Sequence, residues 1–328
     1  MNFEIKTNLN EKELEAWRDL IESAGLTADK PAERTLLVYD EGRLIATGGR
    51  DGCVLKFIAV DKNRRGEDIT ATLLTELRRD AFDLGYSHLF LYTKPENRYT
   101  FENLFFYEVA QTDNVLFMEN VRGGIQDFLD SLPNFSQPGE IGAIIMNCNP
   151  FTNGHKALIK RAAEECERVF VFVLSEDKSE FSAEDRIEMV KLGTQDMPNV
   201  TVLPGSHYII SSATFPTYFL KNRDTASTAA CEVDVEIFCR RLAPRLSITR
   251  RYVGTEPTSP LTAMYNAELK KVLPKCGISV CEIERVCHDG KPISASDVRE
   301  KIKKGDTEGL SNLIPKTTLD YLLKKDYV

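Results

Sequence analysis

The chain has 328 residues, which at a typical size of roughly 150 residues per domain suggests about two domains. It carries 42 lysine and arginine residues against 50 aspartate and glutamate residues, and 42% of its residues are hydrophobic, as in an ordinary folded protein. This acidic balance without a basic tract argues against nucleic acid or an anionic membrane as a partner, although it allows a local basic pocket for a phosphorylated small molecule.

Neither a membrane span, a secretory signal nor a metal site is expected. The longest strongly apolar run, Val169–Leu174, is far shorter than the roughly 18 residues that cross a membrane. The first residues lack the apolar stretch of a secretory signal, so we expect a cytoplasmic protein without disulfides. Cys276, Cys281, Cys287 and His288 could form a zinc cluster, but their spacing fits no usual structural zinc site, and no metal site is predicted.

The first 120 residues show an alternation of helical and strand patterns. Apolar residues at helical spacing predict two helices, and alternating residues around Asp40-Glu41-Gly42 predict a β-hairpin. The order of these elements resembles that of GNAT-type acetyltransferase domains. The predicted elements are the helix Glu11–Glu22, the strands Thr35–Tyr39, Arg43–Gly48 and Cys53–Val60, the helix Ile69–Leu84 and the strand His88–Thr93.

The turn that binds acetyl-CoA in GNAT domains is poorly matched here. Its pattern is (Q/R)-x-x-G-x-(G/A), in which small residues let backbone N–H groups approach the diphosphate. The corresponding stretch is Asn63-Arg64-Arg65-Gly66-Glu67-Asp68, and only Gly66 fits. Asp68 places a carboxylate where the diphosphate would lie, and Asn63 replaces the leading residue. We therefore expect a GNAT-like α+β domain at residues 1–125 without acetyltransferase activity.

Residues 121–140 contain glycines, prolines, a short helical piece and a polar stretch, and they suggest a linker at residues 126–140. The remainder, residues 141–328, alternates strands and helices and predicts an α/β fold, with a Rossmann-like parallel sheet covered by helices on both faces. Its predicted strands are Ile141–Asn147, Val169–Leu174, Val200–Leu203, Tyr252–Gly254 and Ile278–Ile283, and its predicted helices are Asn153–Cys166, Ser182–Gly193, Leu261–Val272, Ser296–Lys303 and Lys316–Lys324.

The main chemical signal is Asn149-Pro150-Phe151-Thr152-Asn153-Gly154-His155, at the first strand-to-helix junction of this half. Ligands of open α/β sheets bind at the carboxyl ends of strands. Thr152 and His155 share one face of the first helical turn, where free N–H groups and the helix dipole attract an anion. Gly154 lets a phosphate approach the backbone. The pattern indicates a site for the α-phosphate of a nucleoside triphosphate, although a histidine covering a helix start would explain the tetrapeptide equally well.

Two further segments point to the same chemistry. Ile293–Arg299 again runs into a helix, with Ser294 and Ser296 at its start and Arg299 one turn on, suited to bind phosphate. Taken alone, this segment could be a serine N-cap beside a surface arginine. Lys178 follows the second parallel strand, where it could meet a substrate anion or the α-phosphate.

In this order the three segments resemble the HxGH nucleotidylyltransferase superfamily, with Thr152 in place of the first histidine. The T-N-G-H and K-x-x-F-(S/T)-x-x-x-R blocks also resemble pantetheine-phosphate adenylyltransferase. That enzyme is a single domain, however, and has a different sequence where this chain has Asn147-Cys148-Asn149. The string GAIIMNCNPFTNGHKALI, the GNAT-like half and Val253-Gly254-Thr255-Glu256-Pro257 resemble the citrate lyase ligase family over essentially the whole chain.

This resemblance implies an acid–thiol ligase. Such an enzyme activates acetate with ATP and Mg²⁺, releases diphosphate, and acetylates the thiol of the prosthetic group on the acyl-carrier subunit of citrate lyase. The alternative is an adenylyltransferase that joins AMP to a phosphorylated small molecule such as phosphopantetheine. The implied catalytic residues are Thr152, His155 and Lys178. The residues implied in ATP binding are Asn149, Phe151, Gly154, Gly254, Thr255, Glu256, Ser294, Ser296 and Arg299.

Overall fold

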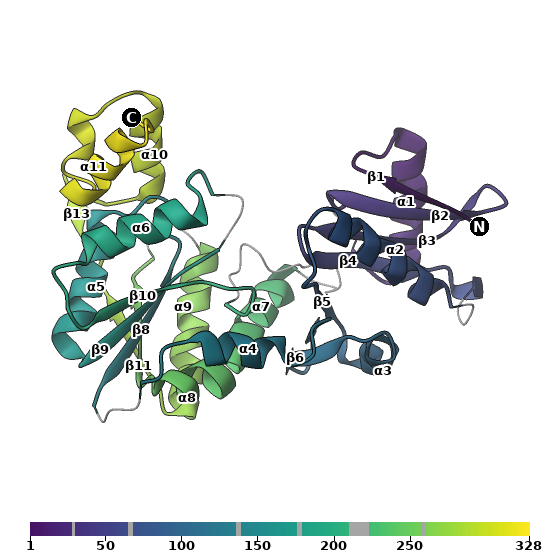
Figure 1. Cartoon of the computed structure of the whole chain (residues 1–328), viewed down its shortest axis with the longest axis horizontal. Coiled ribbons are helices and arrows are strands. Elements are labelled where there is room, and N and C mark those ends of the chain that lie inside the picture. Colours follow the sequence, from purple (N-terminus) through teal and green to yellow (C-terminus); the bar gives the residue numbers. More distant parts are fainter. Residues whose placement is uncertain (28–29, 65–67, 136–138, 176–178, 210–222, 257–259) are drawn as a thin grey trace. The chain divides into compact units, whose positions relative to one another are not determined.

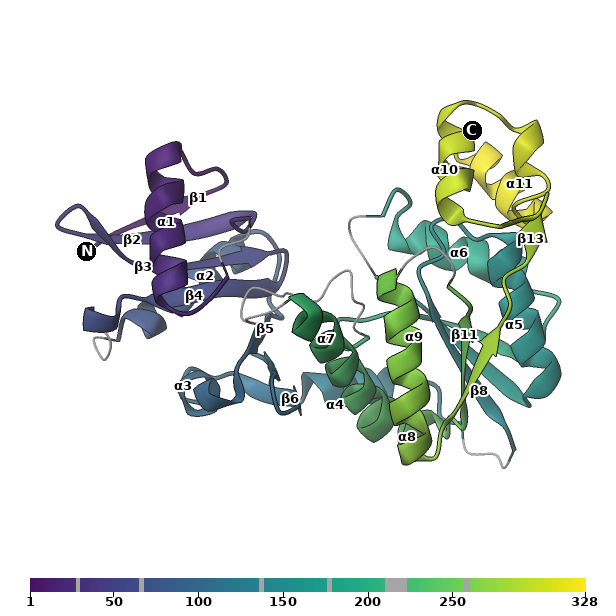
Figure 2. The ribbon, with the colours of Figure 1, turned by 180° about the vertical axis from the view of Figure 1, so that it is seen from behind.

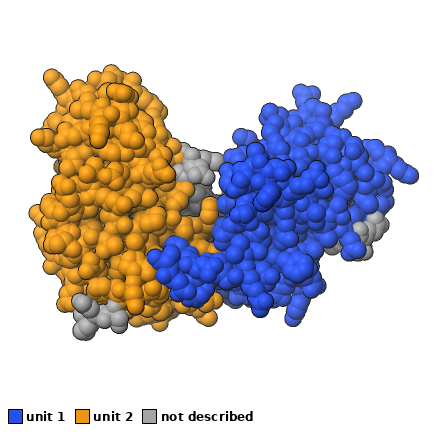
Figure 3. Space-filling model, viewed as in Figure 1, with its two compact units in different colours: residues 1–131, 215–236 blue, residues 132–214, 237–328 orange. Residues whose placement is uncertain are grey.

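The computed structural model covers the whole chain (Figure 1) and describes all residues except 28–29, 65–67, 136–138, 176–178, 210–222 and 257–259. The chain divides into two compact units (Figure 3): unit 1 contains residues 1–131 and 215–236, and unit 2 contains residues 132–214 and 237–328. This division differs from the expected linker at 126–140. The first border falls at Ser131–Leu132, and a segment far along the chain groups with unit 1, which composition near a boundary does not reveal.

Unit 1 contains a seven-stranded sheet of order β1-β2-β3-β4-β5-β7-β6. Neighbouring strands are antiparallel except for β4 and β5, which are parallel. Its strands are β1 (Asn2–Lys6), β2 (Arg34–Asp40), β3 (Arg43–Asp51), β4 (Val54–Val60), β5 (Phe90–Thr93), β6 (Tyr107–Gln111) and β7 (Leu116–Glu119). Its helices are α1 (Glu11–Ser23), η1 (Lys62–Arg64), α2 (Ile69–Asp83), η2 (Pro95–Asn97), α3 (Arg98–Glu102), α4 (Gly124–Ser131) and, up to residue 236, α7 (Arg223–Ile237).

The predicted helix–hairpin–strand–helix–strand order of this unit is confirmed. Helix α1 begins in a capping box between Asn10 and Glu13, and its Trp17 is buried in the core of the unit. The prediction missed β1, β6 and β7, which are only four or five residues long. The short helical piece expected in the boundary stretch corresponds to α4, which buries Ile125 and Leu129.

A cavity of about 650 Å³ lies between β4 and β5. The two strands pair only where Val54–Leu55 meet Phe90–Leu91, and beyond that point residues of both strands line the cavity. Asp68 is the N-cap of α2, adopts a left-handed conformation with φ of 54°, and also lines the cavity. The acidic residue that the sequence places in the GNAT turn therefore belongs to the cavity lining.

Unit 2 contains a parallel five-stranded sheet of order β10-β9-β8-β11-β12. The first strand of this unit, β8, lies at the centre of the sheet, and the chain crosses from one side of β8 to the other between β10 and β11. This confirms the predicted Rossmann-like fold and places its topological switch point between β8 and β11, where such sheets bind ligands. The strands are β8 (Ile141–Met146), β9 (Arg168–Val173), β10 (Val200–Pro204), β11 (Arg250–Gly254) and β12 (Ser279–Ile283), with a separate ribbon of β13 (Cys287–His288) and β14 (Lys291–Pro292).

Helices cover both faces of this sheet (Figures 1 and 2). On one face Ile144 and Tyr252 pack with Ile159 and Ala162 of α5 in the main core cluster. Side chains alternate along strands, so Ile145 and Arg251 belong to the opposite face. The helices of the unit are α5 (Asn153–Glu165), α6 (Ala183–Gly193), η3 (Phe238–Leu242), α8 (Ala243–Leu246), α9 (Pro260–Val272), η4 (Leu273–Cys276), α10 (Ala295–Lys303), η5 (Glu308–Leu310) and α11 (Lys316–Lys324).

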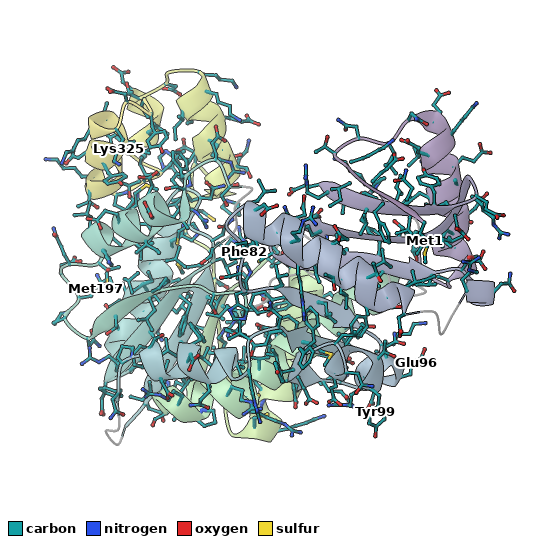
Figure 4. The ribbon with its side chains drawn as sticks, turned by 45° about the vertical axis from the view of Figure 1, so that its right-hand side comes forward. Met1, Phe82, Glu96, Tyr99, Met197 and Lys325 are labelled. Carbon is teal, nitrogen blue, oxygen red and sulfur yellow. The ribbon has the colours of Figure 1, made fainter. Side chains whose placement is uncertain are left out.

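Asp185 of α6 binds the C-terminal residues through hydrogen bonds and an ion pair. Its carboxylate accepts hydrogen bonds from Tyr321 at 2.7 Å and Tyr327 at 2.8 Å, and Lys325 (labelled in Figure 4) lies 3.5 Å away. Burial by itself would raise the pKa of Asp185, but hydrogen bonds from these tyrosines and Ser182, with the charge of Lys325, lower it to about 2. Helix α6 is thereby fixed at its first turn. In the described residues, no helix is long and apolar enough to cross a membrane.

Candidate active site

One arginine organises the carboxyl ends of β8 and β9. Arg186 of α6 is fully buried, and its guanidinium donates to the carbonyl oxygens of Asn147 at 3.0 Å, Leu174 at 2.7 Å and Phe181 at 3.1 Å. It also binds the side-chain oxygen of Asn147. The N–H of Phe181 in turn donates to the side chain of Asn149 at 3.2 Å. These bonds hold Asn147 and Asn149, which lead to the T-N-G-H segment, together with Leu174 and Phe181 after β9.

The T-N-G-H segment forms a reciprocal cap at the start of α5. The hydroxyl oxygen of Thr152 accepts from the backbone N–H of His155 at 3.3 Å, and the backbone N–H of Thr152 donates to Nδ1 of His155 at 3.1 Å. Phe151 is buried and its ring stacks on the imidazole, with centroids 6.0 Å apart. Because Nδ1 accepts a hydrogen bond, the neutral ring carries its proton on Nε2, where it can donate to an anion.

The imidazole is uncharged at neutral pH. Burial lowers the pKa of His155 to about 4, and the positive charge of Arg285 acts in the same direction. His155 therefore offers a neutral N–H donor rather than a cation.

This lowered pKa predicts a pH dependence of stability. An unfolded histidine has a pKa near 6.5, so between about pH 6.5 and 4 it binds a proton that the folded protein excludes. The free energy of unfolding should therefore decrease as the pH is lowered through this window. Urea unfolding of the wild type and His155→Gln at pH 7, 6 and 5 measures the effect. The loss should be smaller in the variant, and equal losses in both proteins would contradict the prediction.

A cavity of about 510 Å³ lies at the switch point of unit 2. It is bounded by the ends of β8, β11 and β12 and by the first turns of α5 and α10. The structure thus brings together three segments that lie far apart in the sequence. The predicted site residues that line the cavity are Thr152, Gly154, His155, Gly254, Glu256, Ser294 and Ser296.

Four other predicted residues are not part of the described cavity lining, but each of them contacts another residue of the site: Asn149, Phe151, Thr255 and Arg299. Phe151 stacks on His155, as described above. Arg299 donates to the carbonyl oxygen of Asn149 at 2.6 Å and to the hydroxyl of Ser296 at 3.0 Å. Thr255 accepts two hydrogen bonds from Arg285. The remaining predicted residue, Lys178, lies outside the described residues.

The sequence analysis missed Arg285, which follows β12 and lines the cavity. Its Nε donates to the carbonyl oxygen of Thr255 at 2.7 Å, and its guanidinium pairs with Glu256. Glu256 was predicted to bind ATP, and this ion pair gives it a second role in positioning Arg285. The signal that could have revealed Arg285 was its position directly after a predicted parallel strand, at the edge where such sheets bind ligands.

A parallel sheet of this order, with two helix N-termini and a histidine at its switch point, is typical of a nucleotidylyltransferase-like domain. A family model described as "Citrate lyase ligase C-terminal domain" matches residues 141–322, and one described as "Acetyltransferase (GNAT) family" matches residues 3–105. The citrate (pro-3S)-lyase ligase of Klebsiella pneumoniae is 41% identical over 91% of this chain and 89% of its own length. That of Escherichia coli (strain K12) is 40% identical over 97% and 92%, respectively. The chain belongs to the citrate lyase ligase family, as its motifs predicted.

The second resemblance noted in the sequence is also present at a lower level. The phosphopantetheine adenylyltransferase of Streptococcus equi subsp. zooepidemicus (strain H70) is 25% identical over 167 residues, which are 47% of this chain and 99% of that protein. This match therefore leaves about half of the chain uncovered, unlike the match to the ligases.

Proposed function

We propose that the protein is an ATP-dependent acid–thiol ligase that adenylates acetate and then acetylates the prosthetic-group thiol of the citrate lyase acyl-carrier subunit, which activates citrate lyase. Membership of the citrate lyase ligase family over nearly the whole chain supports this activity. The observation that carries the proposal is the cavity in which Thr152, Gly154 and His155 meet Ser294 and Ser296. Two helix N-termini at one cavity suit a triphosphate better than a single phosphate.

In the first step an acetate oxygen attacks the α-phosphorus, and the bond from that phosphorus to the diphosphate breaks. Charge builds on the α-phosphoryl oxygens and on the departing diphosphate, so catalysis consists mostly of positioning and electrostatic stabilisation. Nε2–H of His155 would donate to an α-phosphoryl oxygen, with Lys178 beside the entering carboxylate. The first turn of α10, with Ser294 and Ser296, would hold the diphosphate.

In the second step the thiol sulfur attacks the acyl carbon of the adenylate, AMP leaves as the thioester forms, and the thiol proton passes to water. No nucleophile from the protein is needed in either step. Mg²⁺ would neutralise phosphate charge, and the described residues contain no group of three acidic, cysteine or histidine side chains that could hold a metal.

Exchange of labelled diphosphate into ATP tests the proposed function, with acetate or phosphopantetheine as the only variable. Acetate-dependent exchange supports the ligase. Exchange that requires phosphopantetheine and ignores acetate would overturn it in favour of the adenylyltransferase.

Arg299 provides a test of how the triphosphate is held. Arg299→Ala should weaken ATP binding about 10-fold and AMP binding much less, because Arg299 fixes Ser296 at the helix start assigned to the β- and γ-phosphates. Titrating both nucleotides against the wild type and the variant gives the comparison. Equal losses for ATP and AMP would remove Arg299 and its neighbours from the diphosphate site.

For unit 1 we propose a role in docking the acyl-carrier subunit or presenting its arm, without acetyl transfer from acetyl-CoA. The supporting observation is Asp68, which is the N-cap residue of α2 and lines the unit 1 cavity, so that its negative charge would repel a diphosphate there. Calorimetric titration of the full chain with acetyl-CoA should show weak binding or none. Micromolar affinity would contradict this role.

A further inference from the structure

Arg251 is a buried cation in the wall of the unit 2 cavity. It lies on β11, its residue is only 3% exposed, and it lines the cavity. Its guanidinium carbon lies 4.6 Å from the centroid of the Phe238 ring, so one face of the group is covered by an aromatic side chain. The edges of the guanidinium, which carry its N–H donors, are left for other partners.

Two of the three guanidinium nitrogens find no acceptor among the residues that the structure describes. Within the described part of the chain, Nε and Nη1 of Arg251 are buried without a hydrogen-bond partner. Arg285, the other arginine of the cavity, is paired with Glu256. A buried charge without a partner costs several kcal/mol, and proteins normally pair such groups or leave them in water. An anionic ligand in the cavity would supply the opposite charge that Arg251 does not find among the described residues.

The surroundings of Arg251 indicate which anion fits. Arg251 pairs in register with Ala143 of β8, and side chains two residues further along a strand lie on the same face of the sheet. Ile145 and Val253 are therefore on the face of Arg251, nearer to the strand ends, and both line the cavity. A guanidinium next to branched apolar side chains suits a carboxylate that carries a short alkyl group. The serines and N–H groups suited to phosphate belong to a different element, the first turn of α10.

We propose that Arg251 binds the carboxylate of the short-chain acid substrate, with its alkyl group against Ile145 and Val253. The inference rests on the proposed ligase function and assigns the residue that selects the acid. Arg251 would hold one carboxylate oxygen while the other attacks the α-phosphorus. This role would explain a buried charge that no group in the described residues pairs with: stability is given up for substrate binding.

Diphosphate exchange in the full-length protein, measured over a range of acetate and ATP concentrations, tests this assignment. Arg251→Met should raise the KM for acetate at least about 30-fold, the usual minimum for losing one partner of a buried charge pair, and change the KM for ATP by less than about threefold. Its thermal midpoint should equal or exceed that of the wild type, because an unpaired buried charge is replaced by an apolar chain. Arg251→Lys should give a smaller rise, since an ammonium keeps the charge without the planar fork.

A matched control is Arg168→Met. Arg168 lies 5.1 Å from the Phe135 ring and also has a buried Nε without a partner in the described structure, but it is not among the described residues of the cavity wall. Arg168→Met should leave the KM for acetate and the KM for ATP unchanged. An unaltered acetate KM in a folded Arg251→Met or Arg251→Lys protein overturns the assignment. So does an ATP KM that rises as much as the acetate KM, which would place Arg251 at the nucleotide. Absence of acetate-dependent exchange in the wild type would instead refute the proposed function.

Discussion

His155→Ala should slow formation of the acyl adenylate about 100- to 1,000-fold, the usual loss when one preorganised donor to a developing charge is removed. The donor is preorganised in three ways. The N–H of Thr152 fixes the tautomer, the ring of Phe151 fixes its plane, and burial with the charge of Arg285 keeps the imidazole neutral. A donor held this way needs no reorganisation when charge builds on the phosphate.

The same contacts mean that this substitution has a cost in stability as well. His155 is part of the cap of α5, so His155→Ala should also lose about 1 kcal/mol of the free energy of unfolding. Diphosphate exchange and urea unfolding on the same samples separate the two effects. His288→Ala is the matched control, because His288 is outside the described lining of the cavity and should leave exchange unchanged. An exchange rate for His155→Ala within a few-fold of the wild type would show that the T-N-G-H segment only caps the helix.

The sequence predicted the parts of the site that local patterns encode. Thr152 and His155, and the serines of the last motif, each lie within one helical turn, so spacing alone places them on a common face. Sheet topology accounts only for the first of these, since α5 follows β8 whereas α10 follows the separate β13–β14 ribbon. His155 and Ser294, about 140 positions apart, were grouped in advance through the family resemblance of their motifs, and the structure places both in one cavity lining.

The missed residues depend on long-range packing. Arg285 is held by Thr255 and Glu256, and Arg251 lies over Phe238, and none of these partners follows from a motif or a period. The sequence assigned Glu256 and Arg299 to ATP binding and did not predict their contacts within the site, for the same reason. Their side chains bind other site residues in the structure, which one-dimensional spacing does not encode. The grouping of residues 215–236 with unit 1 belongs to this class too.

Arg186 should give the largest loss of stability in the molecule's second half. Arg186→Met would remove a fully buried guanidinium that satisfies the carbonyl oxygens of Asn147, Leu174 and Phe181. Each buried acceptor left without a donor costs about 1–3 kcal/mol, and water entering the gap should recover part of this. We therefore expect a loss of roughly 3–5 kcal/mol in the free energy of unfolding, among the larger effects of single substitutions.

The measurement is urea unfolding of the full-length protein. Lys191→Met is the control, because Lys191 is an exposed residue of the same helix. The control should change the free energy of unfolding by less than about 0.5 kcal/mol. Arg186→Lys should fail to restore stability, since one ammonium cannot reach carbonyl groups on three segments at once. Exchange activity should fall with the stability of Arg186→Met, because the same bonds hold the loops that precede Thr152 and follow β9. A variant that lost exchange but kept the wild-type free energy of unfolding would contradict this structural role and place Arg186 at the substrate instead.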